Sequence, residues 1–289
     1  MKIGIIGFGK MGSAIGARLV ACNHELIAWS RDQRKVEASK IAAYASTPRQ
    51  VIDQSDIIIS ILANDEATER AYFGAGGICE ARLDGKVIIE MCTMLPERAR
   101  QLCHAVHSAG GAFLECPVGG TVKPALDGAL VGMAAGDRAT FDRVRPLLDE
   151  MTRRLDFLGD VGNAATMKLA INLPLAIYWK TLAEALSMLE GSGVDNALAI
   201  SVIADSSGGP TVLKNREAVV VETLNGADQI STVSIDVLFK DLLLALKQSE
   251  GSSCSVSISK TTSDAYENAI QKGLGEFDGS TLTRFLVND

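Results

Sequence analysis

The most constraining feature of the sequence is a short apolar run that is followed at once by a glycine-rich turn. Residues 3–6 are Ile-Gly-Ile-Ile, and Gly7, Gly9 and Gly12 then form the pattern G-x-G-x-x-G. This pattern predicts a strand, a tight turn at Gly7, close approach of a pyrophosphate to Gly9, and close packing of a helix at Gly12. The N–H groups at the start of that helix favour a bound anion. The feature therefore predicts a dinucleotide-binding α/β domain.

Apolar runs alternate with amphipathic stretches up to about Gly159. Strands are expected at 3–6, 25–29, 56–61, 86–90 and 112–115, and helices at 11–22, 48–54 and 96–109. Continuous apolar strands that are separated by helices predict a mostly parallel sheet covered on both faces. The fold class expected for residues 1–161 is therefore α/β, a doubly wound Rossmann domain.

The pattern changes after about Gly162, where strand-like runs give way to helical periodicity. Helices are expected at 163–190, 195–204, 232–249 and 256–272, with turns at 191–193, 206–210 and 250–253. One buried helical face is expected to contain Ile235, Leu238, Phe239, Leu242, Leu243 and Leu246. Because 289 residues suggest two domains at roughly 150 residues each, residues 162–289 are expected to form an all-α domain. Its apolar character suggests a homodimer or homotetramer formed through this domain.

Composition excludes several classes of protein. Hydrophobic residues make up 47% of the chain and charged residues 22%, which is typical of a protein with a buried core. The net charge of −7 and the absence of a basic block argue against a nucleic-acid partner. The apolar run at 57–63 is far shorter than the roughly 20 residues of a membrane helix, and the first residues do not resemble a signal peptide. The chain is therefore expected to be cytoplasmic.

The cysteines and histidines do not predict a metal site. Six cysteines lack any C-x-x-C pair, which indicates free thiols in a reducing compartment: Cys22, Cys79, Cys92, Cys103, Cys116 and Cys254. His104 and His107 share a helix face, with Cys103 beside them in sequence, but no third ligand has suitable spacing. A solvent-exposed face is the preferred interpretation.

The end of the second expected strand bears on the choice of cofactor. An NAD enzyme usually places Asp or Glu there for the ribose 2′-hydroxyl, whereas this sequence has Ser30 followed by Arg31. A hydroxyl and a guanidinium suit a 2′-phosphate, and Arg34 is close enough in sequence to assist. NADP (NADPH) is therefore favoured over NAD. The alternative is that Arg31 is simply solvated and Asp32 holds the ribose.

Two further stretches suggest a substrate site. The turn Gly119-Gly120-Thr121 offers backbone N–H groups and a hydroxyl to an oxyanion, although it is equally interpretable as a turn with no ligand. Lys168 and Asn172 lie at i and i+4, on one face of a helix at the expected domain boundary. A lysine that faces a cleft in an apolar stretch has a lowered pKa and exchanges protons near neutral pH. The alternative is an exposed lysine beside an asparagine.

Five separated motifs, in order, resemble those of the β-hydroxyacid dehydrogenase family, in its 3-hydroxyisobutyrate dehydrogenase-like form. They are the glycine turn, Cys92-Thr93 before Pro96, Pro117-Val-Gly-Gly-Thr121, Gly162-Asn-x-x-x-x-Lys168-x-x-x-Asn172, and Phe239-Lys240-Asp241-Leu; the ending Gly273-x-Gly-x-x-Asp278-x-Ser280 also fits. The resemblance covers nearly the whole chain. It implies hydride exchange between NAD(P) and the carbon β to a carboxylate.

The resemblance also implies roles for residues. Lys168 would be catalytic, with Asn172 beside it, and Lys240 would close over the cofactor from the helical domain. The expected substrate-binding residues are Thr93, Gly119, Gly120, Thr121 and Lys240. The expected cofactor-binding residues are Gly7, Phe8, Gly9, Lys10, Met11, Gly12, Ser30, Arg31, Arg34, Leu62, Ala63, Asn64, Thr93, Lys240 and Asp241.

The function expected from these features is NADP-dependent oxidoreduction of a small β-hydroxyacid or semialdehyde, or of a 2-oxo acid. Lys168 would donate or accept the proton. One departure concerns the substrate, because the family's usual turn is Ser-Gly-Gly and the matching residues here are Gly119-Gly120-Thr121. The alternatives are an imine reductase on the same architecture, whose members usually lack the lysine, and a non-catalytic NADP-binding sensor or scaffold.

Overall fold

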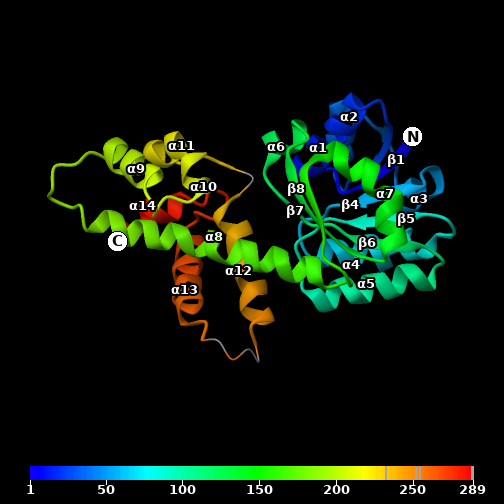
Figure 1. Ribbon diagram of the computed structural model, residues 1–289. Helices are drawn as coiled ribbons and strands as arrows, with labels where there is room; N and C mark the ends of the chain where they lie inside the picture. The colour runs from blue at the N-terminus through cyan, green and yellow to red at the C-terminus, as the bar shows by residue number, and fades with distance from the viewer. Residues whose placement is uncertain (232, 251–252, 254, 288–289) are drawn as a thin grey trace. The chain divides into compact units, whose positions relative to one another are not determined.

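The protein folds into two compact units, Met1–Lys168 and Leu169–Asp289. The computed structural model describes residues 1–231, 233–250, 253 and 255–287. Figure 1 shows a sheet-containing first unit and a helical second unit. Each unit has its own apolar core.

The first unit is built on one twisted sheet. Its strands are β1 (Lys2–Ile6), β2 (Glu25–Trp29), β3 (Ala43–Tyr44), β4 (Ile57–Ser60), β5 (Val87–Glu90), β6 (Ala112–Glu115), β7 (Val118–Gly119), β8 (Leu130–Gly136) and β9 (Thr152–Phe157). The order is β3-β2-β1-β4-β5-β6-β8-β7, with β9 paired to β8, and β1 to β6 are all parallel. The direction of winding reverses between β1 and β4. In open α/β sheets, ligands bind outside the carboxyl ends of the strands at such a point.

Helices cover both faces of this sheet (Figure 1). One face carries α1 (Lys10–Ala21), α2 (Gln33–Ser39), α6 (Val122–Leu126) and α7 (Arg138–Met151), and the other carries α3 (Pro48–Gln54), α4 (Asp65–Phe73) and α5 (Pro96–Ser108). Successive strand side chains alternate between the two faces: Ile57 and Ile59 pack with the first set, and Ile58 packs with the second. The expected doubly wound α/β fold is confirmed.

Several elements of the first unit escaped the sequence analysis. The five expected strands are present, but β3, β7, β8 and β9 were not expected. β8 contains Gly132 and ends in Ala-Ala-Gly, residues that rarely form strands. Pairing with β6, β7 and β9 builds this strand, and a Cβ on Gly132 would lie 2.8 Å from a Leu155 side-chain carbon. Tertiary packing therefore overrides local propensity here.

Among the described residues, the regular secondary structure of the second unit consists of helices joined by turns and loops, with two isolated β-bridges. Helix α8 (Asn163–Ser187) starts in the first unit and ends in the second. It is followed by α9 (Asn196–Asp205), α10 (Thr211–Lys214), α11 (Glu217–Leu224), α12 (Ile235–Gln248), α13 (Ser257–Gln271) and α14 (Thr281–Val287). Trp179, Leu238, Tyr266 and Leu282 lie in its core.

Helix α12 differs from the prediction in one residue of its buried face. Leu243 was expected on the buried face of α12, but 45% of its surface is exposed. It lies one residue beyond buried Leu242, a rotation of about 100°, and Ala245 completes the buried face instead. The expected start of this helix at Thr232, part of the turn at 250–253 (Gly251 and Ser252), and Cys254 lie outside the described residues.

No helix among the described residues is long and apolar enough to span a membrane. No disulfide joins the five cysteines in the described part of the chain to one another. No group of three or more metal-ligating side chains occurs there, and His104 and His107 are both exposed on α5.

Candidate functional site

The glycine turn joins β1 to α1 at the point where the sheet reverses. The N–H of Gly7 donates to the carbonyl of Trp29 (3.0 Å), and Gly7 has a φ of +102°. A Cβ on Gly7 would collide with the carbonyl of Ile61, and a Cβ on Gly12 would collide with the carbonyl of Gly7. A Cβ on Gly9 would meet nothing within 4 Å. Two glycines are thus required by packing, while the third faces open space.

The N-terminus of α1 has the character of an anion site. Gly9 is the N-cap, no side chain caps the helix, and its first turn contains no acidic residue. Backbone N–H groups and the helix dipole at such an end favour negative charge. The Phe8 side chain is buried in the core, so only its backbone borders the turn. The turn therefore fits the pyrophosphate of a dinucleotide, with Gly9 as the place of close approach.

The segment after β2 begins with the half-buried Ser30. Its Oγ accepts a hydrogen bond from the N–H of Asp32 (3.3 Å). Asp32 is the N-cap of α2, and its Oδ1 also accepts from Arg34 Nε (2.9 Å). The Arg34 guanidinium lowers the pKa of Asp32 through this hydrogen bond. Asp32 is thus engaged within its own loop, whereas Arg31 is exposed.

The segments after β4 and β5 are held together. The N–H of Leu62 donates to Cys92 Sγ (2.9 Å), and the N–H of Met91 donates to the carbonyl of Ser60 (2.8 Å). Asn64 Oδ1 accepts from the N–H of Ala67 and so caps α4. The Asn64 side chain therefore has a structural role, and Leu62 and Ala63 precede it on the way out of the sheet.

A buried carboxylate that the sequence analysis missed supports the Thr93 segment. Glu90, at the end of β5, accepts from the N–H of Cys92 (2.9 Å) and from the Tyr72 hydroxyl (2.7 Å). Burial raises the pKa of Glu90 above its usual range. The only sequence signal was an acidic residue closing an apolar strand. Thr93 itself is half-buried. It lies two residues after Met91, whose N–H donates to the carbonyl of Ser60 on β4.

The Gly119-Gly120-Thr121 turn leads from β7 into α6. Gly120 has a φ of +127°, and a Cβ there would lie 2.8 Å from a Leu130 side-chain carbon. At Gly119 the nearest atom to a Cβ is a Val131 carbon at 3.7 Å, an ordinary contact. Thr121 is the N-cap residue of α6 but its side chain makes no cap hydrogen bond. Since α6 packs on α1, this turn lies on the face of the sheet that carries the glycine-turn helix.

The predicted residues of the helical unit form a hydrogen-bonded cluster. Asn172, only 6% exposed, donates through Nδ2 to Asp241 Oδ2 (2.7 Å). The Lys240 ammonium lies 3.0 Å from Asp241 Oδ1. Asn172, Lys240 and Asp241 are thus brought together in this unit. Lys168 is half-buried on α8, one turn before Asn172, and belongs to the first unit.

Several predicted site residues of the first unit lie just after the carboxyl ends of parallel strands. Gly7, Ser30, Leu62 and Thr93 come after β1, β2, β4 and β5, whose carboxyl ends meet at one edge. This common edge, with its reversal between β1 and β4, is where a dinucleotide binds in such sheets.

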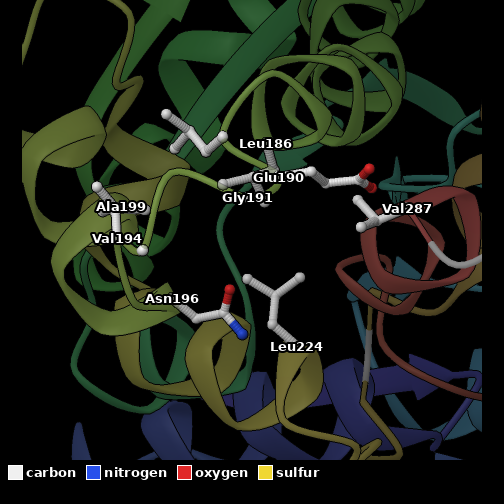
Figure 2. Close-up of a pocket in the computed structure, with 10 residues that line it drawn as sticks. Leu186, Glu190, Gly191, Val194, Asn196, Ala199, Leu224 and Val287 are labelled. Carbon is white, nitrogen blue, oxygen red and sulfur yellow. The ribbon is translucent and has the colours of Figure 1, made fainter.

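A separate cavity of about 230 Å³ lies in the helical unit. Figure 2 shows Leu186, Val194, Leu224 and Val287 around it, together with Glu190 and Asn196. None of the predicted site residues lines this cavity.

Comparison with known families accounts for the whole architecture. Residues 2–159 match the NAD binding domain of 6-phosphogluconate dehydrogenase, and residues 162–286 match the NAD-binding domain of NADP-dependent 3-hydroxyisobutyrate dehydrogenase. Glyoxylate/succinic semialdehyde reductase 1 of Arabidopsis thaliana is 28% identical over 98% of this chain and 97% of its own length. The 2-hydroxy-3-oxopropionate reductase of Escherichia coli (strain K12) is 27% identical over 99% and 97%.

Other relatives differ in length or in detail. The chain spans 50% of the cytokine-like nuclear factor N-PAC of Anopheles gambiae, to which it is 27% identical over 98% of its own length. The structure of Psf3 in complex with NADP+ and 2-OPP has a TM-score of 0.89 and 25% identity, covering 98% of this chain and 99% of that one. An imine reductase from Myxococcus stipitatus shares the fold with a TM-score of 0.63 at 21% identity, covering 99% of both chains. Two family matches over nearly the whole length, on the fold described above, show that the chain belongs to the β-hydroxyacid dehydrogenase family of NAD(P)-dependent oxidoreductases, which act on hydroxyl groups.

Proposed function

We propose that the protein is an NADP-dependent oxidoreductase of a small β-hydroxyacid and its semialdehyde, or of a 2-oxo acid, with Lys168 as proton donor and acceptor. The observation that carries this proposal is the arrangement on α8. Lys168 and Asn172 lie one turn apart, and Asp241 fixes the amide of Asn172 at 2.7 Å. The relatives named as reductases of glyoxylate, semialdehyde and oxopropionate substrates support the substrate class.

The cofactor would be held by the first unit. The turn from Gly7 to Gly12, with Phe8, Lys10 and Met11, fits the pyrophosphate through its backbone N–H groups. Ser30, Arg31 and Arg34 are proposed to face the 2′-phosphate of NADP, and the Psf3 complex with NADP+ supports this choice. Leu62, Ala63, Asn64 and Thr93 are proposed to border the rest of the dinucleotide, and Lys240 and Asp241 are proposed to contribute from the helical unit. When bound, the nicotinamide supplies or removes the hydride.

The side chains of the protein are proposed to bind the substrate and to transfer its proton. In the reducing direction, the Lys168 ammonium donates a hydrogen bond to the carbonyl oxygen, stabilises the developing alkoxide and gives up its proton. Because Asn172 Nδ2 is engaged by Asp241, its Oδ1 is directed to accept a hydrogen bond from the amine or a substrate hydroxyl. Thr93 and the N–H groups of the 119–121 turn are proposed to hold the substrate carboxylate.

A lysine-to-methionine substitution tests the central role. We expect Lys168→Met to lower the kcat of carbonyl reduction at least about 100-fold, because general acid–base catalysis contributes about 10²–10⁴. NADPH affinity should change little. The measurement is NADPH oxidation with glyoxylate, succinic semialdehyde and tartronate semialdehyde, beside direct NADPH titration. Lys180→Met, the same change on the same helix at a residue paired with Glu184, is the control and should retain activity.

The same assays distinguish the alternatives. Reduction of a cyclic imine without carbonyl turnover would instead identify an imine reductase. Tight NADPH binding without turnover of any of these compounds would identify a sensor or scaffold. Carbonyl turnover that survives Lys168→Met would contradict the proposed mechanism.

The cofactor preference has its own test. We expect Arg31→Ala to weaken NADPH binding about tenfold to a hundredfold, because a charge-assisted hydrogen bond contributes about 1.5–3 kcal/mol. NADH lacks the 2′-phosphate and serves as the internal control, so its dissociation constant should stay within about twofold. Equal losses for the two cofactors would refute the preference for NADP.

We further propose self-association through the helical unit. Leu198 and Val202, one turn apart on α9, are 53% and 61% exposed, which is typical of an apolar face that another subunit covers. Introducing glutamate at both positions should reduce the molar mass measured by light scattering to that of one chain. An unchanged mass in the double variant would exclude this face as the interface.

A further inference from the structure

A buried glutamate holds the start of the helix that carries Lys168. Glu115 is the last residue of β6 and is only 2% exposed. Its Oε1 accepts hydrogen bonds from the backbone N–H groups of Gly162 (2.6 Å) and Ala164 (3.0 Å), and the N–H of Ala165 also points to the carboxylate. These are N–H groups of the first turn of α8, which have no partner within the helix. Glu115 therefore performs the task of an N-cap from 47 residues away.

The chain enters α8 through a position that only glycine allows. Gly162 has a φ of +105°, and a Cβ there would collide with the guanidinium of Arg100 on α5. Glycine by itself leaves the direction of the helix loosely defined, because it permits many backbone conformations. The hydrogen bonds that the Glu115 carboxylate accepts from these backbone N–H groups fix the direction in which α8 starts. A charged acceptor makes them about twice as strong as bonds between neutral groups.

Lys168 lies close to this anchored turn. At about 1.5 Å per residue, the four residues from Ala164 to Lys168 span about 6 Å along the axis. The negative charge of ionised Glu115 also interacts favourably with the positive, N-terminal end of the α8 dipole. The second carboxylate oxygen, Oε2, is buried and has no hydrogen-bond partner among the described residues. Oε1 is therefore the oxygen that accepts the hydrogen bonds from Gly162 and Ala164 at the start of α8.

We propose that Glu115 is a positioning residue for the reaction: it fixes the first turn of α8 and so places the amine of Lys168. This proposal rests on the proposed catalytic role of Lys168. Glu115 touches neither the cofactor nor the substrate in this role, and acts only through α8. Burial raises the pKa of Glu115, while the hydrogen bonds from the backbone N–H groups of α8 and the charge of Arg100 on α5 favour its ionised form.

The kinetic test uses the full chain with Glu115→Gln and Glu115→Met. Gln keeps one neutral acceptor, so kcat should fall about tenfold; Met keeps none, so kcat should fall about a hundredfold, the typical cost of a misplacement of about 1 Å. KM and the dissociation constant of NADPH should stay within about threefold. The partial rescue by Gln separates loss of the acceptor from loss of the side-chain volume.

The matched control is Asp137→Asn. Asp137 caps α7 in the same unit by accepting from the N–H of Thr140 (2.8 Å), so this variant weakens a helix cap that carries no site residue. It should lose stability while kcat stays within about twofold. A loss of kcat in Asp137→Asn as large as that in Glu115→Gln would overturn the proposal.

A second readout needs no turnover. The protein is labelled by reductive ¹³C-methylation of its lysines, the Lys168 signal is assigned with Lys168→Arg, and amide exchange of Ala164 and Ala165 is measured by NMR. Glu115→Gln and Glu115→Met should shift the Lys168 signal and accelerate both amides, and Asp137→Asn should do neither. Wild-type values in both Glu115 variants would overturn the role of Glu115. If the wild type reduces no carbonyl compound, the proposed function fails, and these spectra still decide whether Glu115 places Lys168.

Discussion

At the scale of the residue, the glycines of the site have different reasons to be glycine. Gly120 has a positive φ and a side-chain carbon of Leu130 close to where a Cβ would lie. Gly119 has neither restriction, since its nearest neighbour is Val131 at 3.7 Å. The turn differs from the Ser-Gly-Gly that the resemblance predicts at 119 and at 121, and at 119 the backbone accepts a side chain.

This difference predicts opposite outcomes for two neighbouring substitutions. Gly120→Ala should lower the free energy of unfolding by about 1–2 kcal/mol, because an L-residue is strained at this φ and its Cβ crowds Leu130. Gly119→Ser should change it by less than about 0.5 kcal/mol. Urea unfolding of the two variants and the wild type measures both effects. Equal destabilisation would contradict the geometry of the turn.

At the scale of the element, the unit from β1 through the turn to α1 combines packing with ligand binding. Gly12 is required by contact with the Gly7 carbonyl, whereas Gly9 is required by nothing in the protein itself. The N-cap conformation of Gly9, with a φ of −82°, is one that alanine adopts. The reason for glycine at this position is therefore expected to be the ligand.

A second matched pair tests that interpretation. Gly9→Ala should keep or slightly raise the stability of the free protein while weakening NADPH at least about tenfold, because the added methyl fills the space of the pyrophosphate. Gly12→Ala should lower both stability and affinity, because helix and turn are forced apart. Thermal unfolding and NADPH titration measure the two quantities. Full NADPH affinity in Gly9→Ala would show that the dinucleotide binds elsewhere.

The elements that the sequence predicted best are those with strong local patterns. β2, α3 and β6 have the expected bounds, because apolar runs or a capped helix with proline at its start define them locally. β8 and β9 were missed because Gly132 and the charged Arg153 and Arg154 hide the strand pattern. Leu243 was wrongly assigned to the core, because Leu242 and Leu243 point about 100° apart on the helix and the structure buries Leu242.

At the scale of the whole molecule, the strand order determines which segments share an edge. The sheet places β4 beside β1, although β2 and β3 intervene in the chain, and so it brings the segments after Gly7 and Ser60 together. Burial at that edge leaves Glu90 in an apolar environment, where its pKa is raised above the usual 4.5. Tyr72 and Cys92 are its hydrogen-bonding partners there.

The raised pKa predicts a pH dependence of stability. Between pH 4.5 and the native pKa of Glu90, the folded protein binds more protons at this group than the unfolded chain. The contribution of Glu90 to stability is therefore full below pH 4.5 and is lost as the pH rises through that window. Glu90→Gln lacks the titration, so it should gain stability relative to wild type from pH 4 to pH 7 in urea unfolding. Parallel curves for the two proteins would contradict the raised pKa.

The sequence by itself determined the α/β and all-α halves, the glycine turn, the position of Lys168 and Asn172 one turn apart on one helix, and the family. Each strand, helix and single motif depends on residues within about one or two helical turns of each other, so local periodicity and spacing record them, and the order of the motifs along the chain indicates the family. Only the tertiary structure decided that Asp241 holds Asn172 from 69 residues away, that Glu115 anchors α8, and that Glu90 supports the Thr93 segment. Such contacts depend on which strands and helices pack together, and that choice is made by burial of the whole core, which no short pattern in the chain encodes.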